Sequence, residues 1–138
     1  MPHFYNLISC EILRMKVLLV DDSGVMRKII ARGLNSLWVD DVVEAADGVE
    51  AVAKFGDGEG FDLILTDWNM PNMNGLELVK TIRGGGHKLP IMMITTESEK
   101  AQVMLAIQAG VNDYLVKPFD QDTLQQKLER VLPCPANA

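Results

Sequence analysis

The chain has 138 residues, of which 48% are hydrophobic and 23% are charged, and its formal net charge is −6. This length and composition are ordinary for one globular domain with a substantial core. The negative charge argues against a nucleic-acid-binding protein, which needs a basic surface, and no apolar stretch reaches the ~20 residues of a membrane helix. Cys10 and Cys134 have neither the spacing of a zinc site nor the number of a disulfide framework.

The two ends of the chain are expected to lie outside the folded domain. Residues 1–14 lack the basic start, long apolar core and small-residue cleavage site of a signal peptide. We expect an N-terminal extension here, either disordered or the product of an upstream start, because Met15 directly precedes the first strand-like run. The folded domain is then expected over residues 15–134, and residues 135–138 form a tail.

The first half of the chain alternates strand and helix patterns. A strand is predicted over 16–20, and the helix after it is capped by Ser23 or Asp22. One face of that helix is predicted to carry Val25, Met26, Ile29, Ile30, Gly33 and Leu34. A second, weaker strand follows over 42–45. The short helix after it is predicted to carry Val49, Val52, Ala53 and Phe55.

The second half continues the alternation. A strand is predicted over 61–66, and Pro71 and Gly75 lie in the loop before the next helix, which carries Leu76, Leu78, Val79 and Ile82. Residues 84–86 are glycines that favour a left-handed helix end. The remaining elements are predicted as a strand opened by Pro90, a helix over 97–109 closed by Gly110, a strand over 113–116 and a helix over 120–132.

This alternation predicts an α/β fold built from βαβ units, with five strands and five helices. Right-handed crossovers place helices on both faces of a parallel sheet. We therefore expect a flavodoxin-like, doubly wound five-stranded sheet in the order 2-1-3-4-5. In such sheets the ligand crevice lies at the carboxyl ends of the strands, where the strand order reverses between strands 1 and 3.

Polar side chains follow four of the predicted strands. Asp21 and Asp22 end the first strand, Asp67 the third, Thr95 the fourth and Lys117 the fifth. Carboxylate oxygens suit Mg²⁺, which often binds one or two carboxylates together with a phosphate. A lysine can pair with a phosphoryl oxygen as a point charge. The sequence therefore predicts a divalent metal and a phosphoryl group at one end of the sheet.

Each of these residues also has a simpler interpretation. Asp22 alone can be a helix cap, Asp67 alone a solvated strand end, and Lys117 alone a surface lysine, while Thr96 rivals Thr95 by position. An FMN-binding electron carrier shares the expected fold, but it needs a Ser/Thr-rich phosphate loop after the first strand. Two aspartates occupy that place and would repel a phosphate, so the flavin alternative ranks far below.

Asp67 is the best candidate for a nucleophile. Carboxylates form covalent aspartyl-phosphate intermediates, and phosphoryl transfer depends on positioning and charge neutralisation more than on acid–base groups. His3 and His87 fall in expected termini or loops. The lack of a histidine beside a serine or cysteine nucleophile is consistent with this chemistry.

At these residues the chain resembles a response-regulator receiver domain of two-component signalling. The resemblance spans essentially residues 15–132. It is carried by residues 20–23 (VDDS), 65–71 (LTDWNMP), 73–75 (MNG), 94–97 (ITTE) and 114–119 (YLVKPF).

The resemblance implies a role for each site residue. Asp67 accepts a phosphoryl group from a phosphohistidine of a partner kinase. Mg²⁺ is held by Asp22, Asp67 and the backbone carbonyl of Asn69, with Asp21 acting largely through water. Thr95 and Lys117 bind the phosphoryl oxygens.

The resemblance also implies a switch in which Thr95 and Tyr114 move together. That movement alters the surface of the helix over 97–109, the strand over 113–116 and the helix over 120–132. Residues expected on this output surface are Lys100, Val103, Ile107, Lys127 and Arg130.

Within the family, residues 68–71 and Glu97 resemble the CheY-like single-domain chemotaxis regulators. This implies a cytoplasmic monomer that a histidine kinase or phosphotransfer protein phosphorylates and that binds a flagellar motor switch, with room for a phosphatase. Such a protein catalyses only its own phosphorylation and dephosphorylation, and is not otherwise an enzyme. The alternative is a phosphorelay intermediate or a phosphate sink.

Overall fold

The computed structural model describes residues 15–131 except 38 and 40, and it has the expected α/β architecture. Five parallel strands pair in the order β2-β1-β3-β4-β5. The strands are β1 (Lys16–Val20), β2 (Asp41–Ala45), β3 (Leu63–Asp67), β4 (Ile91–Thr96) and β5 (Asp113–Lys117). The helices are α2 (Gly24–Ser36), α3 (Gly48–Phe55), α4 (Gly75–Gly84), the 3₁₀ helix η2 (Glu97–Gln102), α5 (Val103–Ala109) and α6 (Gln121–Val131).

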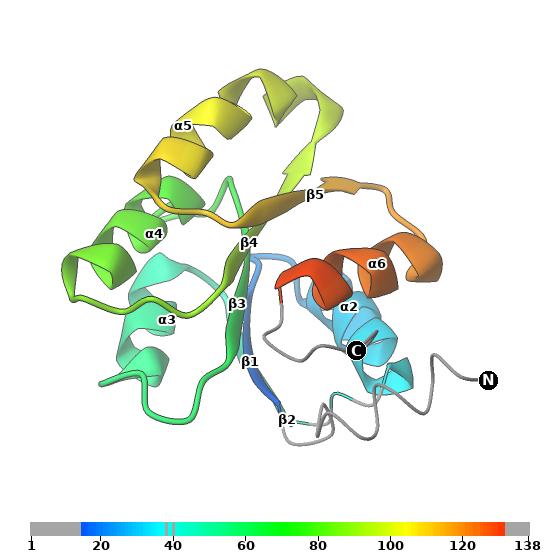
Figure 1. Cartoon of the computed structure of the whole chain (residues 1–138), viewed down its shortest axis with the longest axis horizontal. Helices are drawn as coiled ribbons and strands as arrows, with labels where there is room; N and C mark the ends of the chain where they lie inside the picture. Colours follow the sequence, from blue (N-terminus) through cyan, green and yellow to red (C-terminus); the bar gives the residue numbers. More distant parts are fainter. Residues whose placement is uncertain (1–14, 38, 40, 132–138) are drawn as a thin grey trace.

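Helices cover both faces of the sheet, as a doubly wound fold requires. In Figure 1, α2 and α6 lie on one face and α3, α4 and α5 on the other. Side chains of a strand alternate between faces, so Val17 and Leu19 pack under α2 and α6 while Leu18 and Val20 pack on the opposite side. The continuous apolar runs that predicted the strands are thus explained by burial on both faces.

Side-chain caps begin the helices that follow β1, β2 and β3. The Ser23 hydroxyl accepts a hydrogen bond from the Met26 N–H, so Ser23 and not Asp22 is the cap of α2. Asp47 caps α3 in the same way. Asn74 and Glu77 form a reciprocal capping box at the start of α4. Asp22 is left available at the carboxyl end of β1.

The predicted apolar faces of the first two helices were wrong in part. In α2, Ile30 and Leu34 are buried, but Val25 and Ile29 are 73% and 56% exposed. In α3 the exposed valine is Val49. The apolar stripe on these helices is wider than the surface that meets the sheet, so periodicity alone could not show which of its sides faces the core.

The segment predicted as one helix over 97–109 consists of two elements. Residues Glu97–Gln102 form a 3₁₀ helix, and the α-helix begins only at Val103. Gly110 closes it, as predicted, and adopts the left-handed conformation (φ 117°). The end of α4 differs from the prediction, because its cap Gly85 is right-handed and the positive φ falls on Gly86.

Two strands extend one residue further toward the candidate site than predicted. β3 begins at Leu63 and includes Asp67, and β5 includes Lys117, so both polar residues are part of the sheet. The expected extension over 1–14 and the tail over 135–138 lie outside the described residues.

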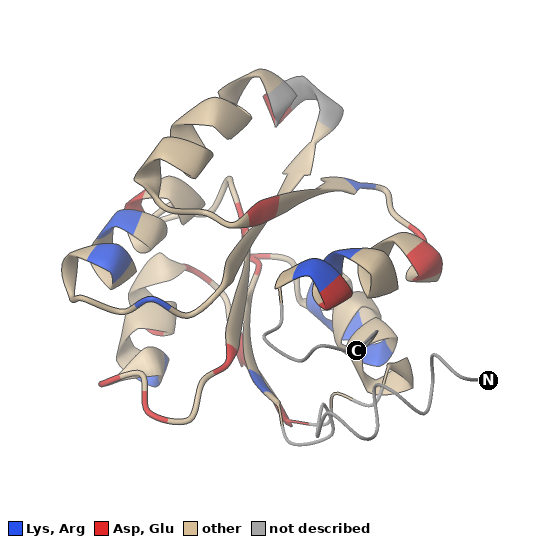
Figure 2. Ribbon diagram, in the orientation of Figure 1, with Lys and Arg blue, Asp and Glu red and all other residues tan. Residues whose placement is uncertain are grey.

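Charged residues lie mainly on the helices, in the loops and near the strand ends (Figure 2). Among the helices in the described part of the chain, none is long and apolar enough to cross a membrane.

Candidate metal and phosphoacceptor site

Three carboxylates meet at the carboxyl ends of β1 and β3. These strands are adjacent, with Val20 opposite Thr66, so the residues that follow them lie side by side. Asp21, Asp22 and Asp67 each offer an oxygen, and these oxygens lie within 4.8 Å of one another. Asp21 and Asp67 are buried and Asp22 is exposed. The predicted acidic cluster therefore lies at the carboxyl ends of β1 and β3, where the strand order reverses.

Backbone amides fix the two buried carboxylates. The Ser23 N–H donates to Asp21 Oδ1 at 2.8 Å, and the Trp68 N–H donates to Asp67 Oδ1 at 2.8 Å. Each bond aims one oxygen of its carboxylate at the backbone. The second oxygen of each group, Oδ2, is the one that faces Lys117.

Lys117 reaches into this cluster from β5, two strands away from β3. Its Nζ lies 3.3 Å from Asp67 Oδ2 and 3.4 Å from Asp21 Oδ2. The Lys117–Pro118 peptide bond is cis, the form that the sequence allowed. Because of its two ion pairs, Lys117 is not a free surface lysine, and its ammonium faces the carboxylates of both Asp21 and Asp67.

Burial and neighbouring charges shift the titration of the central pair. Burial raises the pKa of the Asp67 carboxyl to about 6; the Asp21 carboxylate also raises it, while Lys117 and the Trp68 N–H lower it. Burial alone would lower the pKa of the Lys117 ammonium, but the carboxylates of Asp67 and Asp21 outweigh burial and raise it. The ionised form of Asp67 is thus disfavoured, whereas the charged form of Lys117 is favoured.

The donor set fits a divalent cation. Magnesium prefers oxygen ligands. Burial and, to a lesser extent, the Asp21 carboxylate raise the pKa of Asp67, and a bound cation would favour the ionised form. Asn69 stands two residues after Asp67 in the loop to α4, where a backbone carbonyl can join the carboxylates. The residues present can hold a hard metal ion with water in its remaining positions.

The loop from β3 to α4 is drawn tightly over the strand end. The Gly75 N–H donates to the Trp68 carbonyl at 2.8 Å. A side chain at Gly75 would overlap the Asp67 carbonyl oxygen and press on Met93 Sδ at 3.0 Å. A glycine is required for this close approach of two backbone segments.

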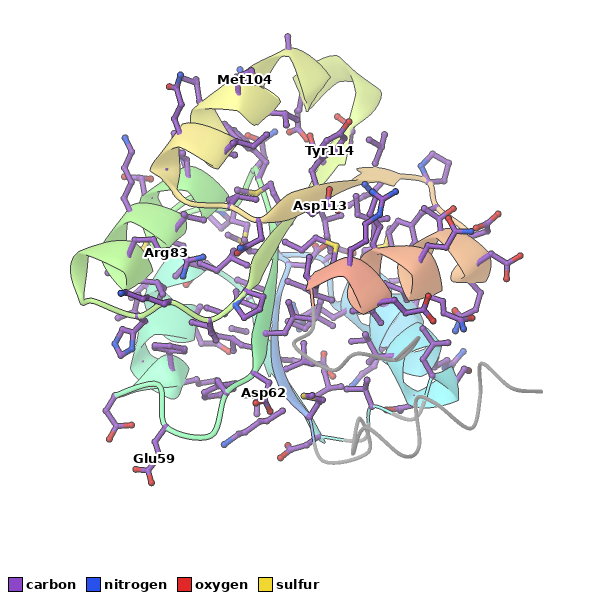
Figure 3. The ribbon with its side chains drawn as sticks, in the orientation of Figure 1. Glu59, Asp62, Arg83, Met104, Asp113 and Tyr114 are labelled. Carbon is purple, nitrogen blue, oxygen red and sulfur yellow. The ribbon has the colours of Figure 1, made fainter. Side chains whose placement is uncertain are left out.

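The two predicted switch residues lie on the neighbouring strands. Asp67 pairs with Ile94 in the sheet, so Thr95 lies one residue beyond it along β4. Thr95 is buried, and its hydroxyl lies 3.3 Å from both the Thr96 carbonyl and Glu99 Oε1. Tyr114 projects from β5 on the side of α5 (Figure 3), and the Lys127 ammonium lies 4.8 Å from its ring centre.

Two residues that contact the site were missed from the sequence. Arg27 Nη1 donates to the Asp21 carbonyl at 2.6 Å, and its Nε pairs with Glu44 at 3.0 Å. The Glu99 carboxylate accepts hydrogen bonds from the Thr95 hydroxyl and from the Asn69 side-chain amide. Arg27 lies one helical turn after the cap of α2, which is a weak local signal, whereas Glu99 and Asn69 are brought together by the fold alone.

The output surface was predicted correctly only in part. Val103 is 7% exposed and belongs to the core, so its prediction as a surface residue was wrong. The exposed apolar residues of α5 are Met104, Leu105 and Ile107. On α6 the Arg130 side chain is exposed, while the Lys127 side chain is mostly buried and its Nζ lies 3.0 Å from Asp113 Oδ1.

Comparison with known sequences identifies the protein family that has this fold and this cluster of carboxylates. The sequence model of the response regulator receiver domain matches residues 17–129, and the chain is a member of that family.

Several of its relatives are chemotaxis proteins. The chain is 52% identical over 120 residues to chemotaxis protein CheY1 of Helicobacter pylori, a match that covers 86% of this chain and 97% of that protein. It is also 52% identical to a CheY homolog of Campylobacter jejuni, over 86% of this chain and 92% of the homolog. Among solved structures, Vibrio cholerae CheY4 has a TM-score of 0.76 at 41% identity, with 86% of this chain and 98% of that chain covered.

Proposed function

We propose that this protein is a stand-alone response regulator that is phosphorylated on Asp67 and thereby switches a protein-binding surface. The observation that carries the proposal is the position of Lys117, whose ammonium lies 3.3 Å from Asp67 and 3.4 Å from Asp21. A cation at this point can bind an oxygen of a phosphoryl group on Asp67. The buried carboxylate and the fixed cation suit covalent transfer to the carboxylate.

The phosphoryl donor is a phosphohistidine of a partner kinase or phosphotransfer protein. An Asp67 oxygen attacks the phosphorus, an O–P bond forms, and the N–P bond of the donor breaks, with its electron pair left on the imidazole nitrogen. A pKa of about 6 leaves Asp67 mostly ionised at neutral pH and therefore nucleophilic. Hydrolysis later transfers the phosphoryl group to water and restores the carboxylate.

Asp21, Asp22, Asp67 and the backbone carbonyl of Asn69 are the proposed ligands of Mg²⁺. When bound, this ion neutralises charge on the carboxylates and the transferring phosphoryl oxygens. The support is the group of oxygens within 4.8 Å. Lys117 and the Thr95 hydroxyl supply the remaining contacts to the phosphoryl oxygens.

The proposed output passes through Thr95 and Tyr114 to the surface of α5, β5 and α6. Thr95 turns toward the phosphoryl group and Tyr114 packs inward, a local change with a global readout. Exposed apolar residues on α5, Met104 and Leu105, fit a protein-binding role for this surface. Because the relatives are chemotaxis proteins over most of this chain, the proposed partner is a flagellar motor switch protein and the proposed setting is a cytoplasmic monomer.

The first prediction tests Asp67 directly. With Mg²⁺, the phosphoryl mimic beryllofluoride is expected to bind the wild-type protein and to quench Trp68, which adjoins the site. A small phosphodonor is expected to add one phosphoryl group by intact mass. Asp67→Asn is expected to abolish both signals, because the nucleophilic oxygen is gone. Asp57→Asn, a matched change on an exposed loop, is expected to behave as the wild type. An equal response of Asp67→Asn would refute the assignment.

A second comparison separates the regulator from a relay intermediate. The beryllofluoride-bound protein is expected to retain a motor-switch protein that the free protein releases. Rapid transfer from phosphorylated Asp67 to a histidine phosphotransfer protein, without any motor-switch binding, would favour the relay instead.

A further inference from the structure

Glu99 connects three groups at the rim of the candidate site. It lies in the 3₁₀ helix η2, directly after β4. Its Oε1 accepts the Thr96 N–H at 2.9 Å and lies 3.3 Å from the Thr95 hydroxyl. Its Oε2 accepts a hydrogen bond from the side-chain amide of Asn69. One carboxylate thus ties β4 and η2 to the loop after β3.

Glu99 and a phosphoryl group on Asp67 would compete for the same donor. A threonine hydroxyl has a single proton to donate. In this structure the acceptors within reach of that proton are the Glu99 carboxylate and the Thr96 carbonyl, each 3.3 Å from the hydroxyl. The charged carboxylate is the stronger acceptor of the two, whereas the proposed function requires the proton at a phosphoryl oxygen. Thr95 cannot serve both acceptors, so phosphorylation has to break the bond to Glu99.

Charge works in the same direction. A phosphoryl group brings negative charge to Asp67, on the strand beside β4, and Glu99 is a further negative charge close to that position. Like charges repel more strongly where solvent screening is weak. The phosphoryl group that attracts the Thr95 hydroxyl therefore also repels the Glu99 carboxylate, which lies 3.3 Å from that hydroxyl in this structure.

We infer that Glu99 is a latch on the unphosphorylated state: it holds the Thr95 hydroxyl and the Asn69 amide, and it is released when the phosphoryl group takes over the hydroxyl. This inference rests on the proposed roles of Asp67 and Thr95. Glu99 acts through Thr95 and is a positioning residue. Its position in η2 matters, because η2 runs straight into α5, which carries the exposed Met104 and Leu105 (Figure 3). Release of the latch frees the segment that leads to the output surface.

The latch predicts that removing Glu99 makes activation easier. At saturating Mg²⁺, we expect Glu99→Ala to bind beryllofluoride about tenfold more tightly than the wild type, because a hydrogen bond to a charged group no longer has to be broken. Glu99→Gln keeps an acceptor without the charge, and about a threefold gain is expected. The measurement is Trp68 fluorescence during a beryllofluoride titration. Glu59→Ala, an exposed glutamate near the amino end of β3, is the control and is expected to match the wild type.

A double-mutant cycle separates the latch from simple removal of charge. Thr95→Val keeps the shape of the side chain and removes the hydroxyl. In this background Glu99→Ala is expected to change beryllofluoride affinity less than twofold, because no hydroxyl is left to hold. A tenfold gain that persists with Thr95→Val would show that the hydrogen bond to Thr95 is not what Glu99 contributes, and it would overturn the latch.

The failure of the latch can be told from the failure of the proposed function. If the wild type binds beryllofluoride and Glu99→Ala stays within twofold of it, the latch alone is refuted. If the wild type does not respond at all, the proposed role of Asp67 fails, and the latch with it. Thermal unfolding shows whether each variant is folded. If Glu99→Ala is not folded, the beryllofluoride affinity of Glu99→Gln is compared with that of the wild type instead.

Discussion

Asp67 combines two demands that oppose each other at the scale of a residue. In its proposed role as the phosphoacceptor it must be buried, so that Lys117 can act on a transferring group without competition from water, and it must be ionised to act as a nucleophile. Burial disfavours the charged form and raises the pKa of Asp67 to about 6, against an ordinary value of 3.8. The ionised Asp67 therefore destabilises the folded protein, and a bound metal ion would reduce this destabilisation.

This destabilisation predicts a pH-dependent stability difference for Asp67→Asn in metal-free buffer. Between pH 3.8 and about 6 the folded wild type holds a proton that the unfolded chain has released, so its stability falls as the pH rises through this range. At pH 7.5 the variant, which has no charge to bury, is expected to be more stable by about 1–3 kcal/mol. Below pH 4 the difference is expected to disappear. Denaturant unfolding with EDTA at several pH values measures it.

The control is Asp57→Asn, whose exposed carboxylate has no burial cost. We expect its unfolding free energy to follow the wild type at every pH. A stability gain of Asp67→Asn that is equally large at pH 4 and pH 7.5 would show that the cause is packing and not ionisation.

At the scale of an element, the short loop from β3 to α4 depends on Gly75. A side chain there would overlap the Asp67 carbonyl oxygen, a backbone atom that cannot swing away. Gly75→Ala is expected to destabilise the fold by about 1–3 kcal/mol, as overpacking does. It is also expected to weaken beryllofluoride binding, because the strand end that carries Asp67 must shift. Thermal unfolding and Trp68 fluorescence measure the two effects.

Gly84 provides the matched comparison in the same helix. An added side chain at Gly84 would meet no atom within 4 Å. Alanine is preferred to glycine in a helix, so Gly84→Ala is expected to leave stability unchanged or raise it by up to about 1 kcal/mol. If both variants lose the same stability, the contact between Gly75 and Asp67 is not the reason.

The elements were predictable where one physical signal dominated. Apolar runs such as 17–20 predict strands because both faces of a parallel sheet are buried, and Ser23 predicts a helix start because a hydroxyl satisfies an end N–H. The orientation of α2 was not predictable, because Val25 and Ile29 are as apolar as the residues that do reach the core. The 3₁₀ helix at Glu97–Gln102 was not predictable either, since no local pattern separates it from the α-helix that follows.

At the scale of the whole molecule, the candidate site is a consequence of topology. Asp21, Asp67 and Lys117 come from three strands, and the parallel sheet places all three strand ends on one side. The crevice rule predicted this convergence from the sequence. Glu99 escaped prediction, because its distance to Asn69 depends on how η2 folds back over the loop after β3, for which the chain has no local pattern. The strand-end residues of the site were thus predictable from the sequence, but the contacts of Glu99 were not.

This dependence on topology predicts that Mg²⁺ stabilises the whole fold. Only the folded chain holds oxygens of Asp21, Asp22 and Asp67 within 4.8 Å, so the ion binds the native state and not the unfolded one. At ten times its dissociation constant, a ligand of this kind adds about 1.4 kcal/mol, which for a domain of this size corresponds to a rise in Tm of roughly 3–6 °C. Thermal unfolding with EDTA and with MgCl₂ measures the rise.

Asp22→Asn tests whether the rise comes from this crevice. Asp22 is exposed and does not cap α2, so its amide variant is expected to unfold within about 0.5 kcal/mol of the wild type in EDTA. It is expected to lose most of the rise in Tm with MgCl₂, because one ligand of the ion is gone. NaCl at the same ionic strength is expected to leave both proteins unchanged. A full rise in Asp22→Asn would mean that the ion stabilises the protein elsewhere, and the carboxyl ends of β1 and β3 would then not be its site.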